Sequence, residues 1–262
     1  MTTDVTAAEE PAAPAPAPPA RKRPAPRRSR RWATAGVILI GLLSATSIYL
    51  IWVYFNAGDP DTARYSMDEQ FWFYPVVMVH MVGSCTALGT GALQIWPWLR
   101  RRRPRVHRIC GQLYVWAGVY PAVVTSAILL TFWPEPLLNE SSDILTTVLW
   151  FVSTATGYTL GRRGQYADHR RWMLRSFALT GSFTMSMILI LPISAIFEAA
   201  LYSHFDGNRE LMIQAAAGVQ VWLSWILPLL AVEWWLDYER LRAAKRRRAA
   251  VGTPRDRAAA DI

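Results

Sequence analysis

The chain has 262 residues, of which 52% are hydrophobic, and its 28 lysines and arginines give it a formal net charge of +9. The charges do not alternate with apolar residues, as they do along a soluble amphipathic domain, but form clusters between long uncharged runs. The sequence contains no P-loop, HExxH or GxSxG motif. Composition and motifs thus exclude a soluble catalytic domain of the common kinds and favour an integral membrane protein.

The first 32 residues are rich in proline and alanine and end in a basic cluster. A segment with so few residues to pack is predicted to be disordered. It also makes a poor secretory signal, because its start is acidic and the apolar run behind it is longer than a signal core. We therefore expect residues 1–32 to be a disordered tail and the apolar run that follows to be retained.

The rest of the chain contains six apolar runs, most of which reach the roughly 20 residues that a bilayer-spanning helix needs. They are Ala33–Tyr54, Phe71–Trp96, Ile109–Trp133, Ile144–Leu160, Trp172–Ala200 and Leu211–Leu236, the fourth being the shortest. We predict an all-α integral membrane protein with six transmembrane helices. The membrane domain occupies residues 33–238, with its core at 71–200, and a basic tail follows at 239–262.

The basic residues predict the orientation of these helices. All but two of the 28 lysines and arginines lie before the first run, between the second and third, around the fourth-to-fifth loop, or after the sixth; the exceptions are Arg64 and Arg209. By the positive-inside rule, both termini are cytoplasmic in a multi-pass protein of the cell (inner) membrane. The net positive charge then indicates contact with anionic lipid headgroups and not with nucleic acid.

Small and polar residues recur at steps of three and four along the second to fifth runs, which is the pattern of helix contacts inside a membrane. Examples are Gly83, Ala87 and Gly91 in the second run and Tyr114 and Gly118 in the third. We predict that these four helices form a four-helix bundle of two similar hairpins, each with a basic inner loop. The first and sixth helices are expected to be peripheral.

Three histidines are candidate ligands. His107 and His169 each begin an outward-running helix at the cytoplasmic interface, followed by Arg108 and Arg170 respectively. His80 lies roughly 22 Å further into the membrane, counted at about 1.5 Å per residue, and Met187 lies at the same depth. One metal ion cannot reach both levels.

Several interpretations of these residues remain open. His107 and His169 are suited to ligate one b-type haem, with Arg108 or Arg170 on its propionates. The same pair is also suited to hold a quinone head or a lipid phosphate, or to a structural role at the helix starts. For His80, the alternatives are a ligand role, with Met187 as a partner at its level, and a hydrogen bond to a threonine, a tyrosine or a backbone carbonyl across the bundle.

Three segments resemble a known family. His80 with the following GSCTALGTGALQ, then HRICGQLY, then HRRWMLRSF, are similar to the predicted bacterial membrane proteins of domain of unknown function 2306 (DUF2306), over roughly Phe71–Pro192. Gln112 stands where that family often has arginine. The resemblance implies no activity, and the likeness of the histidine arrangement to two-haem membrane cytochromes is fold-level analogy.

Two functions therefore remain open. One is a b-type haem electron-transfer module that uses the histidines. The other is a non-enzymatic membrane protein that binds quinone or lipid, or assists the assembly of a membrane complex.

Overall fold

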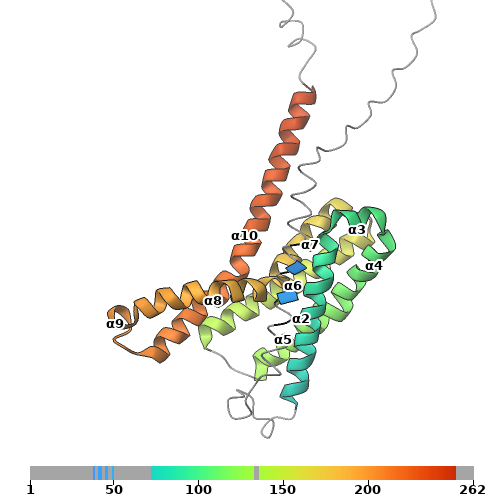
Figure 1. Ribbon diagram of the computed structural model, residues 1–262. Helices are drawn as coiled ribbons and strands as arrows, with labels where there is room; N and C mark the ends of the chain where they lie inside the picture. Colours follow the sequence, from blue (N-terminus) through green and yellow to red (C-terminus); the bar gives the residue numbers. More distant parts are fainter. Residues whose placement is uncertain are drawn as a thin grey trace, which may run out of the picture.

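The computed structural model describes residues 72–132 and 136–251, together with six single positions between 38 and 49. The predicted tail at 1–32, nearly all of the first predicted span and the last residues of the basic tail lie outside the described residues. Every regular element in the described part of the chain is a helix (Figure 1). The all-α prediction is therefore confirmed for this part.

The elements follow one another in this order: α2 (Phe73–Ile95), α3 (Pro97–Arg102), α4 (Pro104–Gln112), the π-helix η1 (Leu113–Val119), α5 (Tyr120–Phe132), α6 (Leu137–Arg162), α7 (Tyr166–Thr180), α8 (Ser182–Ala199), α9 (Leu201–His204) and α10 (Arg209–Val251). Among the described residues, five segments are long and apolar enough to cross a membrane: Phe73–Ile95, Pro104–Phe132, Leu137–Arg162, Ser182–Ala199 and Arg209–Lys245. The chain is thus a multi-pass membrane protein by composition and helix length.

Prolines and a glycine set the helix boundaries at the two basic loops. Pro97 and Pro104 occupy first-turn positions of α3 and α4, where a missing backbone N–H costs nothing. Arg103, which precedes Pro104, is pushed out of the helical region, so α3 ends there. Gly164 adopts a positive φ of 76°, which lets the chain turn from α6 into α7.

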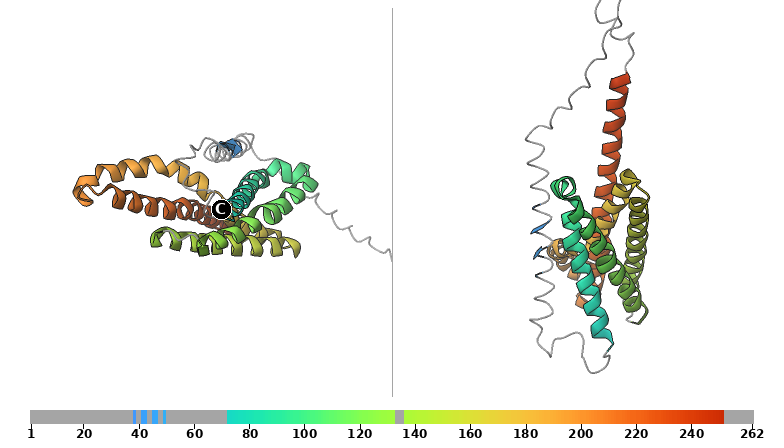
Figure 2. Two further views of the ribbon diagram at one scale, coloured as in Figure 1. Left: turned by 90° about the horizontal axis from the view of Figure 1, so that it is seen from below. Right: turned by 90° about the vertical axis from the view of Figure 1, so that its right-hand side faces the viewer.

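The fifth predicted span differs from the structure. It was expected as one helix over Trp172–Ala200, but α7 ends at Thr180 and α8 begins at Ser182, with Gly181 between them. α8 packs mainly against α10 and not against α6. The paired α8 and first part of α10 extend away from α2 to α5 (Figures 1 and 2), while the first part of α10 still contacts the start of α6 at Trp222. The predicted bundle of two similar hairpins therefore departs from the structure at α8.

The first hairpin is held together by small residues. α2 packs along η1 and α5, and a Cβ atom placed on Gly83 would lie 2.9 Å from the Gly118 carbonyl oxygen. A Cβ on Gly118 would in turn lie 2.9 Å from Ala87. This close approach of two backbones matches the small-residue faces read from the sequence.

The second pair, α6 and α7, is joined to the first by a buried polar network. The Tyr114 hydroxyl lies 2.7 Å from the hydroxyls of both Ser176 and Thr180. The Trp150 indole N–H donates to Thr180 at 2.9 Å, and the hydroxyls of Thr154 and Ser176 are 2.6 Å apart. Since lipid offers no hydrogen-bond partners, these side chains satisfy one another inside the helix contacts.

The expectation that the sixth span is peripheral is wrong. Trp225 of α10 is buried, belongs to the central hydrophobic cluster and donates its indole N–H to Ser142 of α6 at 2.9 Å. α10 contacts α6, α7 and α8. It is also bent (Figure 1), and Pro228 in its interior removes one backbone hydrogen bond. α10 is therefore part of the core and continues as a helix to Val251.

Candidate functional site

Basic residues of α3, α4 and α7 lie at one end of the molecule, which we call the basic end. It comprises Arg100–Arg102 of α3, Arg103 between α3 and α4, His107 of α4, and His169 and Arg170 of α7. Figure 1 shows α3 and the start of α7 at the same end, next to the rising second part of α10. The structure thus brings together the two His-Arg segments of the sequence.

His107 lies among cations. The charges of Arg100 and His169 act on its ring, so the two histidines that the sequence placed at one depth lie within electrostatic range of each other. The backbone carbonyl of His107 accepts a hydrogen bond of 2.7 Å from the side-chain amide of Gln94 on α2. The Nδ1 atom of His107 is buried and has no hydrogen-bond partner among the residues that the structure describes. A buried polar atom left in this state costs free energy, so it marks a place where a ligand atom would be stabilising.

His169 is oriented by α6. Its Nδ1 lies 2.7 Å from the carbonyl oxygen of Gly157, which assigns the proton to Nδ1 and leaves Nε2 as an acceptor. The ring packs against Gly161, where a Cβ would lie 2.8 Å from Nδ1. The glycines at 157 and 161 therefore let α7 approach α6 closely and fix this imidazole.

Arg100 carries an uncompensated charge. Its side chain is exposed, but neighbouring groups partly desolvate the guanidinium, and this desolvation, together with the charges of Arg170 and Arg101, lowers the pKa of Arg100. Among the described residues no carboxylate forms an ion pair with it. The charge of Arg100 is therefore repelled by those of Arg170 and Arg101, and Arg170 alone of these two has a carboxylate partner among the described residues, Glu239.

Two carboxylates of α10 engage α7. Arg170 donates to both oxygens of Glu239, at 2.6 and 3.0 Å. Arg175, about one turn further along α7, makes the same two-pronged contact with Glu233, its longer bond measuring 2.9 Å. Neither pairing was predicted from the sequence. The signal for them was the similar spacing of arginines on α7 and glutamates on α10, which fits two antiparallel helices.

His80 lies between α2 and α5. Its Nδ1 is 3.1 Å from the carbonyl oxygen of Ala122 and 3.2 Å from the Ser126 hydroxyl. Its Nε2 is 3.4 Å from the Ser84 hydroxyl. Both ring nitrogens thus face protein groups. The contact with the Ala122 carbonyl is the hydrogen bond across the bundle that was one of the two alternatives for His80.

The remaining predicted site residues lie elsewhere. Met187 is on α8, which packs on α10, and no hydrogen bond joins it to His80 in the part of the chain that the structure describes. Arg108 is exposed on α4. The described residues contain no group of three histidine, cysteine or acidic side chains arranged to hold a metal ion.

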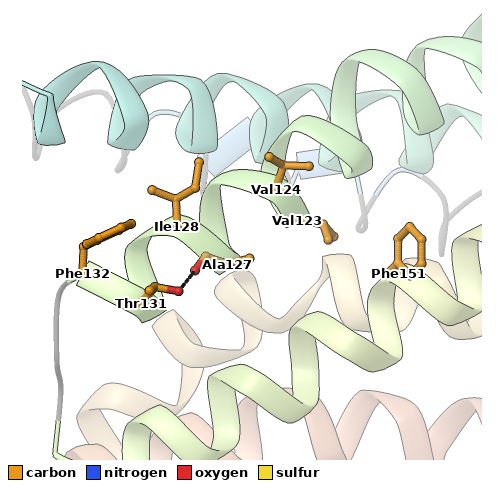
Figure 3. Close-up of a pocket in the computed structure, with 7 residues that line it drawn as sticks. All are labelled: Val123, Val124, Ala127, Ile128, Thr131, Phe132 and Phe151. Atoms are coloured by element: carbon orange, nitrogen blue, oxygen red, sulfur yellow. Dashed lines mark hydrogen bonds between the residues drawn. The ribbon is translucent and has the colours of Figure 1, made fainter.

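One hollow of the described surface is apolar and runs along α5, away from the basic end. It is an open groove lined by Val123, Val124, Ala127, Ile128, Thr131, Phe132 and Phe151 (Figure 3). Its single polar side chain, Thr131, donates to the Ala127 carbonyl within its own helix at 2.8 Å. This groove is suited to contact with lipid chains and offers no polar group to a ligand.

Fold and site together define a multi-pass helical membrane protein with a basic, histidine-containing end. A family model described as "Predicted membrane protein (DUF2306)" matches residues 77–236. The chain therefore belongs to the DUF2306 family, as the sequence resemblance indicated, and the match extends beyond the predicted core into α10. No curated protein and no solved structure matches the sequence.

Proposed function

We propose that this protein is a multi-pass inner-membrane protein whose basic end faces the cytoplasm and binds the phosphate of an anionic lipid headgroup. The orientation rests on the concentration of arginines at that end, as the positive-inside rule requires. The lipid bilayer supplies such headgroups at the depth where the helices leave the membrane. The proposal assigns no catalytic activity.

The observation that carries the proposal is the uncompensated charge of Arg100 beside the buried, unpartnered Nδ1 of His107. A phosphate oxygen accepts hydrogen bonds from both a guanidinium and an imidazole N–H, and these charge-assisted bonds are among the strongest in proteins. The nearby carboxylates do not serve Arg100, because Asp168 pairs with Arg171 and Glu239 with Arg170. A bound phosphate would therefore satisfy both groups at once.

A quinone head fits this site less well. Its carbonyl oxygens would accept a hydrogen bond from His107, but it carries no charge to match Arg100. A negatively charged headgroup matches both the imidazole of His107 and the charge of Arg100. We therefore rank an anionic headgroup above a quinone as the ligand.

The test is a titration of the purified full-length protein, in a neutral detergent, with dihexanoyl phosphatidylglycerol. Dihexanoyl phosphatidylcholine, inorganic phosphate and a short-chain quinone serve as comparison probes. We expect saturable binding of phosphatidylglycerol that Arg100→Gln weakens by about tenfold, the loss of one charge-assisted hydrogen bond.

Arg102→Gln is the matched control, because Arg102 lies on the same short helix and is exposed. It should leave the affinity within about twofold of wild type, the change expected when an exposed charge makes little contact. Equal affinity for phosphatidylcholine, or equal effects of the two variants, would contradict headgroup binding. Tight binding of inorganic phosphate alone would move the ligand from the lipid to a soluble anion.

A b-type haem between His107 and His169 is the second candidate, and one observation favours it. The Nδ1 of His169 faces a backbone carbonyl, the contact that commonly orients a metal-ligating histidine and leaves Nε2 free to coordinate. Haem would supply one-electron chemistry there. At His80, by contrast, both ring nitrogens already face protein groups, Nδ1 the Ala122 carbonyl and Nε2 the Ser84 hydroxyl. Haem-supplemented protein with a Soret band that is lost in His169→Ala would establish this candidate, and its absence would remove it.

A further inference from the structure

We propose that Glu239 of α10 is an internal competitor for the lipid phosphate: its carboxylate holds Arg170 when the site is empty and releases it when the phosphate binds. This inference rests on the proposed headgroup binding and concerns the regulation of that same site. Binding would thereby be coupled to the end of α10.

The contact between Arg170 and Glu239 has the geometry of a phosphate contact. Two parallel N–H···O bonds, 2.6 and 3.0 Å long, join the guanidinium to the carboxylate. A phosphate presents the same pair of acceptor oxygens to an arginine. Glu239 therefore occupies the donors that a headgroup would otherwise engage.

Arg170 belongs electrostatically to the proposed site. Its charge acts on Arg100, and Arg100 in turn acts on His107. A phosphate bound at Arg100 and His107 would attract the Arg170 guanidinium and repel the Glu239 carboxylate. Both effects weaken the existing ion pair.

The ion pair is accessible to such a competitor. The side chains of Arg170 and Glu239 keep 41% and 39% of their exposure, so neither is sealed inside the protein. A shallow hollow lined by Trp235, Tyr238, Glu239, Arg242 and Ala243 adjoins the carboxylate. Ion pairs exposed to this degree contribute little stability, so exchange of the acceptor is not costly.

The ion pair between Arg175 and Glu233 would keep α10 attached to α7 when Glu239 is released. Arg175 keeps only 20% of its side-chain exposure in its pair with Glu233, and its guanidinium lies 4.8 Å from the centre of the Trp172 ring. Among the described residues, its ion-pair partner is Glu233 and not a member of the cluster around Arg100 and His107. Release of Glu239 would therefore free the last part of α10, beyond residue 239, while the pair at 233 still holds the helix to α7.

The experiment compares Glu239→Gln with Glu233→Gln in the full-length protein, titrated with dihexanoyl phosphatidylglycerol. Both variants remove one carboxylate charge from the same helix and one bidentate pair with α7, but only Glu239 pairs with Arg170, whose charge acts on Arg100. We expect Glu239→Gln to bind the probe about fivefold more tightly than wild type, the value of one half-exposed ion pair. Glu233→Gln should leave the affinity within about twofold, since it leaves Arg170 paired.

A second measurement uses the wild-type protein alone. Because coupling is reciprocal, saturating phosphatidylglycerol should speed amide hydrogen exchange in peptides covering 239–251 and leave those covering 225–235 unchanged. Unaltered affinity in Glu239→Gln, or equal tightening by the two variants, overturns the competition while headgroup binding stands. If neither wild type nor Glu239→Gln binds the probe, headgroup binding itself fails and the competition with it.

Discussion

Replacing Gly83 by alanine tests a close backbone-to-backbone contact between α2 and the helix formed by η1 and α5. The added Cβ would lie 2.9 Å from the Gly118 carbonyl oxygen and 3.2 Å from the Ala122 backbone nitrogen. Both neighbours are backbone atoms, so no side chain can rotate away, and the two helices must separate to relieve the contact. Overpacking of this kind costs about 1–3 kcal/mol.

Gly89 offers a matched control on the same helix, because a Cβ placed there would meet nothing within 4 Å. In a soluble protein, a glycine-to-alanine change would also gain about 1 kcal/mol of helix propensity. Within lipid the separated helices are already helical, so this gain is largely absent from both variants. We expect Gly83→Ala to lose about 1–3 kcal/mol of stability and Gly89→Ala to be near neutral.

Reversible unfolding of both variants in mixed detergent micelles, followed by tryptophan fluorescence, measures the difference, because the separated helices stay helical. Gly83→Val, which adds two further methyl groups at the same place, should be less stable again. Equal stability of Gly83→Ala and Gly89→Ala would show that α2 does not approach η1 and α5 as closely as described.

Three further predictions concern the core and the orientation. Tyr114→Phe should lower the free energy of unfolding by about 1 kcal/mol, because the buried hydroxyl contacts are lost while Ser176 and Thr180 keep other partners. The exposed Tyr166→Phe should leave the free energy of unfolding unchanged, and calorimetry of both variants in detergent checks this. His80→Ala should lower thermal stability by about 1 kcal/mol and leave phosphatidylglycerol affinity unchanged, whereas a loss of affinity would place His80 in the ligand site. Reporter fusions after residue 102 should read cytoplasmic and after residue 140 periplasmic, and the reverse pattern would overturn the orientation.

The helix contacts could be predicted from the sequence because close approach in lipid requires small residues at regular steps. Gly83, Ala87, Gly91 and Gly118 are all buried in the structure, as their spacing indicated. The prediction that His107 and His169 lie at the same depth in the membrane came from counting residues from the ends of the predicted spans. These inferences depend only on local helical geometry, which the sequence determines directly.

The departures have a different origin. Nothing in the apolar pattern marks Gly181 as the place where α8 leaves α7, because an apolar run is equally compatible with one helix or two. Glu233 and Glu239 lie on a helix expected to be peripheral, so their arginine partners depended on the position of α10. That position is set by tertiary contacts such as Trp225 with Ser142, which no periodicity reveals.

The central claim, that the basic end binds an anionic headgroup, is tested most directly by native mass spectrometry of the full-length protein released from nanodiscs of equal phosphatidylglycerol and phosphatidylcholine. The account predicts retention of phosphatidylglycerol in preference to phosphatidylcholine by wild type and by Arg102→Gln, and loss of that preference in Arg100→Gln. Equal retention of the two lipids by wild type, or the same preference in all three proteins, would contradict it.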